Sequence, residues 1–540
     1  MAHKADPVLI KGLNSSGIEE FISTIEDAVK IALYGINDSG QLTAIPVDGD
    51  GHMEVALHSP RLPFGSIHAE KLTALFQCDA VYQLNPHEQI ASTSGSGTAT
   101  NGTNNLFNVT TGETIYSYGS IQSRRRLRYR PGQGVIVRYT ALFPANAANS
   151  ILVAGCGTAE SGFYFGYNGT SFGILHVTDG KREIRTLTIS TASTTAENVT
   201  VTLDGIGYSV AVTNSNDAIK TAYEISQGTY AGWEAQQRGN TVIFIANTAA
   251  VKSGSYTLSG TTAAGTFAQD LAGAASTDTW IAQSSWNGDK LDGTGPSGIT
   301  LDPTKGNVYQ IDIQYLGFGS ISFKVEVISD ANNANFVTVH TIKYPNSFTA
   351  PSISQPSFPF TMAAYSAGST TDLSVKCGSF AGFIEGDKNY YGPVVAYGNT
   401  STSVTTTNYY HLITIRNDYE FNGRPNQSVI NIVSFGGCHD DATPVEIFLI
   451  RNATLVGTPN FSQNTSHSPV YVDTSATTLT FSDNDQVVYR LPVGQTGSIL
   501  MDLTNEDINL QPGDTLSVAA RTVTGTATYV LVSLNTREDQ

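Results

Sequence analysis

Residues that could perform chemistry are few in this chain. The best candidate for a metal or redox site is GGCHDD at residues 436–441, which gathers a thiol, an imidazole and two carboxylates. Neighbouring side chains on one loop seldom all face one ion, and no second ligand cluster accompanies them. VDGDGH at residues 47–52 resembles part of a calcium loop but lacks the late Glu that closes one. We interpret both as turns and expect no metal and no cofactor.

Motifs for catalysis are absent from the sequence. G-x-S-x-G, H-E-x-x-H, P-loop and dinucleotide-binding patterns do not occur. A glycosidase on a β-sandwich would need two carboxylates flanking the scissile bond, typically from a Glu-x-Asp-x-x-Glu strand, and none is present. The acidic residues that we considered stand isolated: Glu160, Asp179, Glu183, Asp312 and Glu326. We therefore expect a protein that is not an enzyme, without catalytic residues.

Aromatic residues beside amides suggest sugar binding without catalysis. Tyr167 precedes Asn168, and Trp286 precedes Asn287. An aromatic ring can stack on a sugar face while the amide exchanges hydrogen bonds with hydroxyl groups. The same aromatic residues are also typical of a sandwich core. We favour core packing for these aromatic residues, and the alternative is that all four residues are glycan contacts.

An arginine-rich run at residues 124–130 is the densest charge feature. Basic residues interleaved with an aromatic could bind nucleic acid, but the net charge is −17 and the pI about 4.9, which oppose a polyanionic partner. The run alternates ahead of a Pro-Gly turn, as in a strand. We expect Arg124, Arg126 and Arg128 to pair with carboxylates of this chain or of a neighbouring subunit, as assembly contacts.

An amphipathic helix is predicted over residues 16–33. Apolar residues including Phe21 and Ile25 recur at helical spacing, Ser16 and Glu19 form a capping box, and Gly35 ends the pattern. The helix either packs on its own domain or docks on another subunit.

The N-terminus lacks the apolar stretch of a secretory signal, so we expect synthesis in a cytoplasm, and no stretch is long enough to insert in a membrane. The four cysteines lie far apart and are predicted to be buried small hydrophobic residues.

The remaining sequence predicts a mainly β protein of several domains. Charged residues make up only 14% of the chain, while Gly (51), Tyr (25) and Phe (23) are plentiful, as expected for short strands joined by tight turns. Residues 1–60 are predicted to anchor the protein through the helix and a hairpin. Residues 61–184 and 276–386 form one sandwich, residues 185–275 an inserted β-β-α-β-β domain, and residues 387–540 a C-terminal β-sandwich.

Three resemblances accompany these predictions. The strand order in residues 276–386 resembles the closing half of a concanavalin-like, lectin-type jelly roll, and the inserted domain is similar to small modules of phage tail-sheath proteins. Residues 45–390 resemble virion structural proteins of aquatic tailed phages and large algal viruses, through HMEVALHSPRLPFGSIHAEKLTALFQ, RLRYRPGQGVIVRYTALF, GFYFGYNGTSFGIL and LDPTKGNVYQIDIQYLGFG. This resemblance implies a location in a virion more than a mechanism.

Two functional hypotheses follow. The first is a virion structural protein, such as a capsid decoration, collar, tail fibre or baseplate-peripheral component, which mediates assembly or attachment to a host surface. The second is a lectin-like adhesin that binds glycans. In either case the expected partners are the chain itself, as a homo-oligomer and most simply a trimer, other virion proteins and a host-surface glycan, but no nucleic acid.

Overall fold

The computed structural model describes residues 71–540, apart from short gaps at 131, 159, 315, 329–333, 354–355, 389–391, 407, 440, 484–485 and 540. Before residue 71 it describes two short antiparallel pairs, β1 (Lys11–Leu13) with β2 (Glu19–Phe21) and β3 (Tyr34–Ile36) with β4 (Leu42–Ala44). Residues 1–70 and 71–540 are separate compact units.

The predicted N-terminal helix is wrong at Glu19–Phe21, which form a strand paired with β1. A helix of this kind is stabilised mainly by packing of its apolar face, and here the backbone of three of its residues pairs with a second strand instead. Ile25, the rest of the predicted helix and the predicted turn at residues 47–52 lie outside the described residues.

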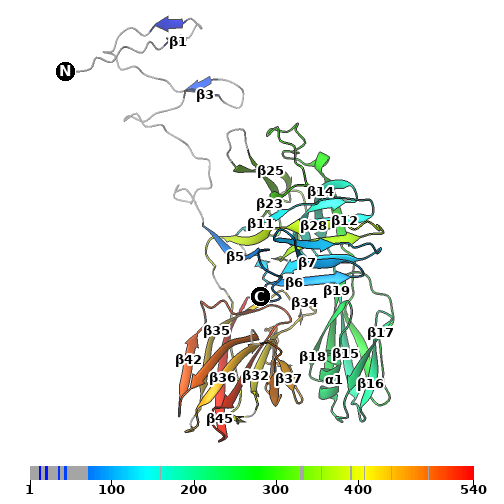
Figure 1. The fold of residues 1–540 in the computed structure, drawn as a ribbon, viewed down its shortest axis with the longest axis vertical. Coiled ribbons are helices and arrows are strands. Elements are labelled where there is room, and N and C mark those ends of the chain that lie inside the picture. The colour runs from blue at the N-terminus through cyan, green and yellow to red at the C-terminus, as the bar shows by residue number, and fades with distance from the viewer. Residues whose placement is uncertain are drawn as a thin grey trace, which may run out of the picture. The chain divides into compact units, whose positions relative to one another are not determined.

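The first of three modules in residues 71–540 is a large sandwich of antiparallel sheets (Figure 1). Its six-stranded sheet has the order β25 (Ala334–Ile342), β24 (Ile321–Ile328), β23 (Asn307–Ile313), β11 (Val135–Ala141), β29 (Ser379–Glu385) and β5 (Leu72–Asp79). The seven-stranded sheet has the order β22 (Thr277–Ala282), β14 (Ser171–Thr178), β13 (Gly162–Asn168), β12 (Ser150–Gly157), β27 (Phe360–Ser366), β9 (Tyr118–Ser123) and β6 (Gln89–Ser94). A three-stranded sheet of β28 (Ser374–Cys377), β8 (Leu106–Thr110) and β7 (Thr98–Gly102) accompanies them.

Buried and partly exposed side chains alternate along these strands, and the buried ones form the core of the large sandwich. On β24, Ile321, Phe323 and Val325 are buried, while the residues between them are partly exposed. The same core contains Phe163 and Phe165 from β13 in the other sheet. Because successive side chains of a strand point to opposite faces, each sheet presents one apolar face, and the two faces pack together. The mainly β class predicted from the sequence is confirmed.

The second, small module leaves and rejoins the large sandwich at neighbouring strands. β14 and β22 pair from Gly173↔Ala282 to Thr178↔Thr277, and the chain between them forms β15 (Arg182–Thr191), β16 (Glu197–Leu203), β17 (Ile206–Val212), α1 (Ala218–Ser226), β18 (Trp233–Arg238), β19 (Thr241–Ala249), β20 (Thr257–Ser259) and β21 (Ala264–Leu271). Two sheets, β18-β19-β15-β21 and β17-β16-β20, share a core with α1. Asp217 caps α1 by accepting a hydrogen bond from the Ile219 backbone.

One detail of the small module differs from the sequence interpretation. The predicted β-β-α-β-β order has two strands on each side of the helix, whereas the module has three strands before α1 and four after it, with β19 paired to β18 and β20 to β16. The two residues between β18 and β19 are Gly239 and Asn240, and Gly239 has a φ of +58°. A two-residue loop that begins with a left-handed glycine is a common hairpin turn, so the local turn determined the pairing.

The third module is the C-terminal sandwich. One sheet contains β30 (Val394–Gly398), β45 (Thr528–Asp539), β35 (Val429–Cys438) and β42 (Ser498–Asp502), with β31 (Thr402–Val404) and β43 (Asn509–Leu510) attached. The other contains β37 (Thr454–Val456), β40 (Thr478–Thr480), β32 (Tyr410–Asn417), β44 (Thr515–Thr522), β36 (Val445–Arg451) and β41 (Val487–Val493), with β38 (Ser462–Gln463) and β39 (Val470–Asp473) attached. Apolar residues of both sheets form its core.

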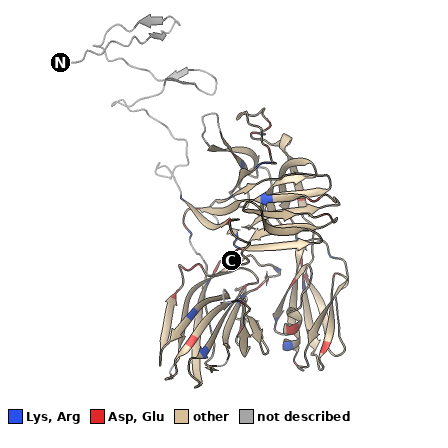
Figure 2. Cartoon of the chain, in the orientation of Figure 1, with Lys and Arg blue, Asp and Glu red and all other residues tan. Residues whose placement is uncertain are grey.

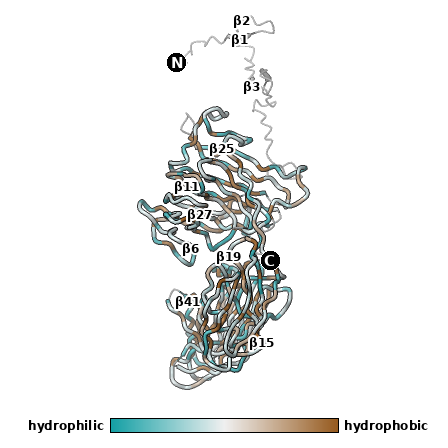
Figure 3. The backbone as a smooth tube through the Cα atoms, turned by 90° about the vertical axis from the view of Figure 1, so that its right-hand side faces the viewer, coloured by the Kyte–Doolittle hydropathy of each residue, from teal (hydrophilic) through white to brown (hydrophobic). Residues whose placement is uncertain are grey.

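Charged side chains are sparse over the strands of all three modules (Figure 2). Hydrophobic residues follow the strands, whereas many connecting segments are hydrophilic (Figure 3). No helix among the described residues has the length and apolar character to cross a membrane. The few buried charges are therefore conspicuous, and most of them lie where one module meets another.

Candidate functional site: charged interfaces between modules

The arginine-rich run is a short strand at the boundary of the large and C-terminal sandwiches. β10 (Leu127–Arg128) pairs with β26 (Ser357–Phe358). Leu127 and Tyr129 are buried in the core of the large sandwich, so the alternating arginines face the other way. Arg126, Arg128 and Arg130 contact residues of the C-terminal sandwich, more than 290 positions away in sequence, whereas Arg124 also donates to the Pro86 carbonyl of the large sandwich.

Two aspartates of the C-terminal sandwich, Asp507 and Asp539, form most of the ion pairs with these basic residues. Asp507 pairs with Arg125 and with Lys388. Asp539 accepts a hydrogen bond from Arg130 at 2.8 Å, and its carboxylate lies 3.7 Å from Arg128. Arg128 also donates to the backbone oxygens of Gln427 and Asp539, at 3.1 and 2.5 Å. A guanidinium group that contacts several acceptors fixes their relative geometry, so this interface joins the two sandwiches specifically.

The three predicted assembly residues differ in their partners. Arg124 lies 3.8 Å from Asp514, and Arg128 contacts Asp539. Arg126 instead donates a long hydrogen bond, 3.4 Å, to the amide oxygen of Gln427. Burial, together with the nearby charge of Arg182, lowers the pKa of Arg126 to about 10. Arg124 and Arg128 thus lie beside carboxylates of the same chain. Arg126 has no carboxylate within ion-pair distance among the described residues, although Glu160 and Asp514 act on its pKa, and a carboxylate partner on a neighbouring subunit stays a prediction.

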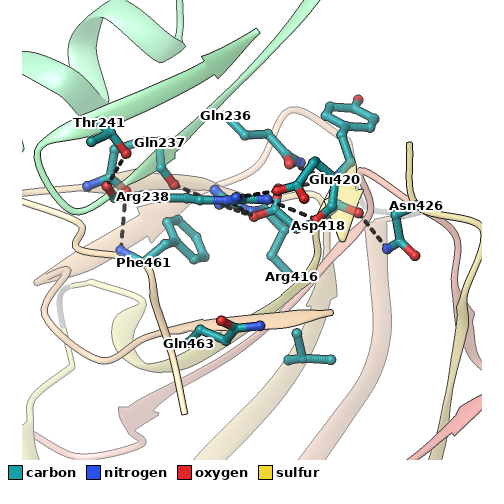
Figure 4. Close-up of polar contacts among 12 residues, drawn as sticks. Gln236, Gln237, Arg238, Thr241, Arg416, Asp418, Glu420, Asn426, Phe461 and Gln463 are labelled. Carbon is teal, nitrogen blue, oxygen red and sulfur yellow. Dashed lines mark hydrogen bonds and ion pairs between the residues drawn. The ribbon is translucent and has the colours of Figure 1, made fainter. Parts of the chain in front are cut away.

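A second interface joins the small module to the C-terminal sandwich. Figure 4 shows Arg238 and Arg416 converging on Asp418. Arg238, the last residue of β18, donates to Asp418 at 2.8 Å and to the Glu420 carboxylate at 2.5 Å. Arg416 donates to the backbone oxygen of Gln237 at 2.7 Å and lies 3.3 Å from Asp418, which is fully buried.

The electrostatics of the two arginines differ. Burial alone would lower the pKa of Arg238, but Asp418 and Glu420 raise it above its ordinary value. Burial lowers the pKa of Arg416, and the attraction of Asp418 only partly offsets this effect. The Arg416 guanidinium also stacks over Phe461, 4.0 Å from the ring centre. Removing one member of such a buried set leaves the others without compensation, at a cost of about 3–5 kcal/mol.

Neutral hydrogen bonds complete this second interface. The Gln236 side chain accepts from the Tyr419 backbone at 2.8 Å, and the Gln237 side chain accepts from the Phe461 backbone at 3.2 Å. Tyr223 of α1 donates to the Leu455 carbonyl at 3.1 Å. Sequence reasoning missed this interface. The one local signal was the alternation of polar and charged residues in RNDYE at 416–420, which by itself names no partner.

The candidate glycan residues do not form one exposed site. Tyr167 and Trp286 are buried, with 7% and 2% of their surface exposed, and both pack against Phe172 in the core of the large sandwich. Tyr167 faces the opposite sheet from its position in β13, and Trp286, which follows the short 3-10 helix Gln283–Ser285, packs into the same core. Asn168 is exposed at the hairpin between β13 and β14, where it pairs with Ser171. Asn287 exchanges two hydrogen bonds with the Thr341 backbone, both 2.8 Å. The prediction that Tyr167 and Trp286 stack on sugars is wrong.

The candidate metal stretch contains ordinary structural contacts. Cys438 ends β35 and is exposed, so the prediction that all four cysteines are buried is wrong here, and Cys78 is partly exposed. His439 shares a hydrogen bond of 2.6 Å with the Gly494 carbonyl. Within residues 71–540, short gaps excepted, no three His, Cys, Asp or Glu side chains are grouped to hold a metal ion. Burial raises the pKa of Cys377 to about 12, which keeps that thiol protonated.

Two of the carboxylates that seemed isolated in the sequence are buried and paired. Glu160 accepts from Arg182 at 3.1 Å, and Glu183 accepts from Arg185 at 2.6 Å. Both arginines belong to β15, the first strand of the small module. The two pairs stabilise the point where this module leaves the large sandwich.

The chain matches no protein-family model, and no curated protein is significantly similar to it.

Proposed function

We propose that this chain is a non-enzymatic structural protein of a virion, displayed as a capsid decoration, collar, fibre or baseplate-peripheral component. The observation that carries the proposal is the pair of charged interfaces that tie both other modules to the C-terminal sandwich. Domain interfaces within a chain are commonly polar enough to permit relative motion. Here, displacement of the small module would separate Arg238 from both Asp418 and Glu420.

Such interfaces suit a protein whose task is to hold a shape. The charge-assisted hydrogen bonds of Arg238 to Asp418 and Glu420 are directional, so they fix how the small module and the C-terminal sandwich are oriented. The strands carry few charges, and their apolar faces are used in three separate cores. In this proposal residues 1–60 anchor the protein to the particle, and residues 71–540 form the displayed part.

The test is the composition of purified particles. Mass spectrometry of density-gradient fractions should find peptides from all three modules in the fraction that contains particles, and cryo-electron microscopy should place residues 71–540 in the density. Genes for portal, sheath or capsid proteins should lie beside this one. Absence of the protein from particles, together with neighbouring genes for secretion components, would refute the proposal.

A lectin-like adhesin is the second candidate. The observation that favours it is a cleft in the large sandwich, which is distinct from the predicted glycan residues Tyr167, Asn168 and Trp286. The cleft is described next.

A further inference from the structure

A cleft of about 610 Å³ opens at one edge of the large sandwich. Its walls come from β14 and the edge strand β22 of the seven-stranded sheet, from the end of β25 in the six-stranded sheet, and from residues 343–353. The volume lies within the range of about 300–1,000 Å³ that is usual for small-molecule sites. Neither edge strand has a further strand beyond it among the described residues.

One wall of the cleft is an aromatic pair. The rings of Tyr344 and Phe348 lie 4.5 Å apart at 37°. Tyr344 is buried and packs edge-on against His176, with ring centres 6.2 Å apart. Phe348 is 55% exposed. The inner ring therefore holds the outer one in place, and the cleft has a supported apolar surface that remains open to solvent.

Buried polar groups lie beside this aromatic pair. His176 is 7% exposed and Ser352 1% exposed. His176 Nε2 and Ser352 Oγ have no hydrogen-bond partner among the described residues. Buried polar atoms are almost always paired, with protein or with a bound molecule, so two unpaired atoms in one wall require an explanation. Both atoms are covered by the wall of the cleft, so a hydroxyl-bearing molecule bonds them only after a small shift of that wall.

The cleft carries no excess charge. Burial lowers the pKa of both His176 and His340, so both rings are neutral at pH 7. The Asn287 backbone donates to His340 Nδ1 at 3.2 Å, which leaves the proton on the other ring nitrogen. Two charged side chains of opposite sign, Asp179 and Lys343, line the cleft and are exposed. A strongly anionic ligand would require a surplus of Arg or Lys, which these walls do not offer.

We propose that this cleft binds a neutral saccharide, with one face of the sugar ring on Phe348 and its hydroxyl groups toward the wall formed by His176 and Ser352. A saccharide combines an apolar ring face with several groups that both donate and accept hydrogen bonds, and this cleft presents the matching surfaces. Asn287, which lines the cleft, acts as a positioning residue, because its amide is already bonded to the Thr341 backbone.

The test uses the whole protein and a panel of methyl glycosides of glucose, galactose, mannose and N-acetylglucosamine. Saturation-transfer NMR should show binding of at least one glycoside through its ring protons. Intrinsic fluorescence should change as well, because two of the three tryptophans, Trp280 and Trp286, adjoin residues that line the cleft.

Substitutions locate the binding. Phe348→Ala removes an exposed ring and should weaken binding at least about tenfold while the protein stays folded. Ser352→Ala, which deletes one unpaired hydroxyl, should weaken it too. Tyr529→Ala is the matched control, since Tyr529 is 60% exposed on the C-terminal sandwich, and it should bind like the original protein.

Three results would overturn the inference: binding of no glycoside in the panel, unchanged binding by Phe348→Ala, or a preference for sialylated or phosphorylated glycosides. The inference rests on the proposed function only in that the cleft would serve attachment to a host surface. The sugar-binding inference and the virion proposal can be refuted independently. Loss of sugar binding leaves a virion location intact, and absence from particles leaves a measured sugar affinity intact.

Discussion

Arg238 and Arg416 are the residues whose contacts most tightly couple two modules. Arg238→Gln should lower the free energy of unfolding by about 3 kcal/mol, because Asp418 is fully buried and loses its closest cation. Urea denaturation measures this change. Arg490→Gln is the control: Arg490 is 60% exposed and pairs with Glu446, so its loss should cost less than about 1 kcal/mol. Equal effects of the two substitutions would contradict the assignment of Arg238 to a buried interface.

Substitutions in the arginine-rich strand should also differ in their effect on stability. Replacing Arg124, Arg126 and Arg128 together with Gln should lower the stability of the protein, because Asp514 and Asp539 lose partners. Arg126→Met alone should change stability little or raise it, since burial disfavours its charge and its hydrogen bond to Gln427 ends on a neutral amide. Thermal unfolding distinguishes the two variants.

Affinity for DNA should be negligible before and after the triple change, and a salt-sensitive affinity lost in the variant would support a nucleic-acid role instead.

Three buried histidines predict a loss of stability in mild acid. Burial lowers the pKa of His176, His340 and His411, and for His411 the nearby Asp473 only partly offsets it. The unfolded histidine has an ordinary pKa of about 6.5, so below that pH the unfolded chain binds more protons than the folded one. The free energy of unfolding should therefore be flat above about pH 7 and fall between about pH 6.5 and 5.

The pH slope identifies the residues responsible. Urea denaturation at several pH values should give a shallower slope for His411→Gln, whatever that change does to stability at pH 7. Val523→Ala alters an exposed side chain that does not titrate and should leave the slope unchanged. A slope that is the same in the original protein and in His411→Gln would show that this histidine titrates alike in the folded and unfolded states.

At the scale of elements, the small module should be removable from the large sandwich. Its two ends lie at paired neighbours, Thr178↔Thr277, and a bridge joins Lys181 to Ala274. Replacing residues 183–272 with a short Gly/Ser linker keeps Arg182 as the partner of Glu160. The cost of closing a loop depends only weakly on its length, so the large sandwich should stay folded.

The same deletion should still weaken the C-terminal sandwich. Asp418 and Glu420 lose Arg238, so one thermal transition should move to a lower temperature while the β signal in circular dichroism persists. Adding Asp418→Asn to the deletion should recover part of that shift, because it removes a buried charge that has lost a partner. A collapsed β signal would show that residues 183–272 belong to the core of the large sandwich.

At the scale of the whole molecule, we expect a homo-oligomer, most simply a trimer, because closed symmetric assemblies of identical subunits are common among structural proteins. Multi-angle light scattering of the purified protein measures the mass directly. The triple Arg→Gln variant should keep the same oligomeric state, since the partners of those arginines belong to their own chain. A monomer both in solution and in the particle would refute the expectation, and dissociation of the variant would place the arginines between subunits.

Local patterns in the sequence predicted much of the fold. Alternation in ISFKVEVI indicates β24, and apolar residues at helical spacing in NDAIKTAYEIS indicate α1. Strands on both sides of residues 185–275 gave the separate small module. These features depend on neighbouring residues, because strand alternation, helix caps and tight turns are settled within a few positions.

Only the tertiary structure decided which residues meet. Tyr167 and Trp286 look alike in sequence whether they stack on a sugar or fill a core, and the opposite sheet decided that they fill a core. The partners of Arg128 and Arg238 lie 411 and 180 positions away. His176 and Ser352 reach the same cleft only because strands of two sheets and a connecting segment meet there. The physical reason is that burial, charge pairing and cavities depend on how whole faces pack together, and no short stretch of sequence specifies that packing.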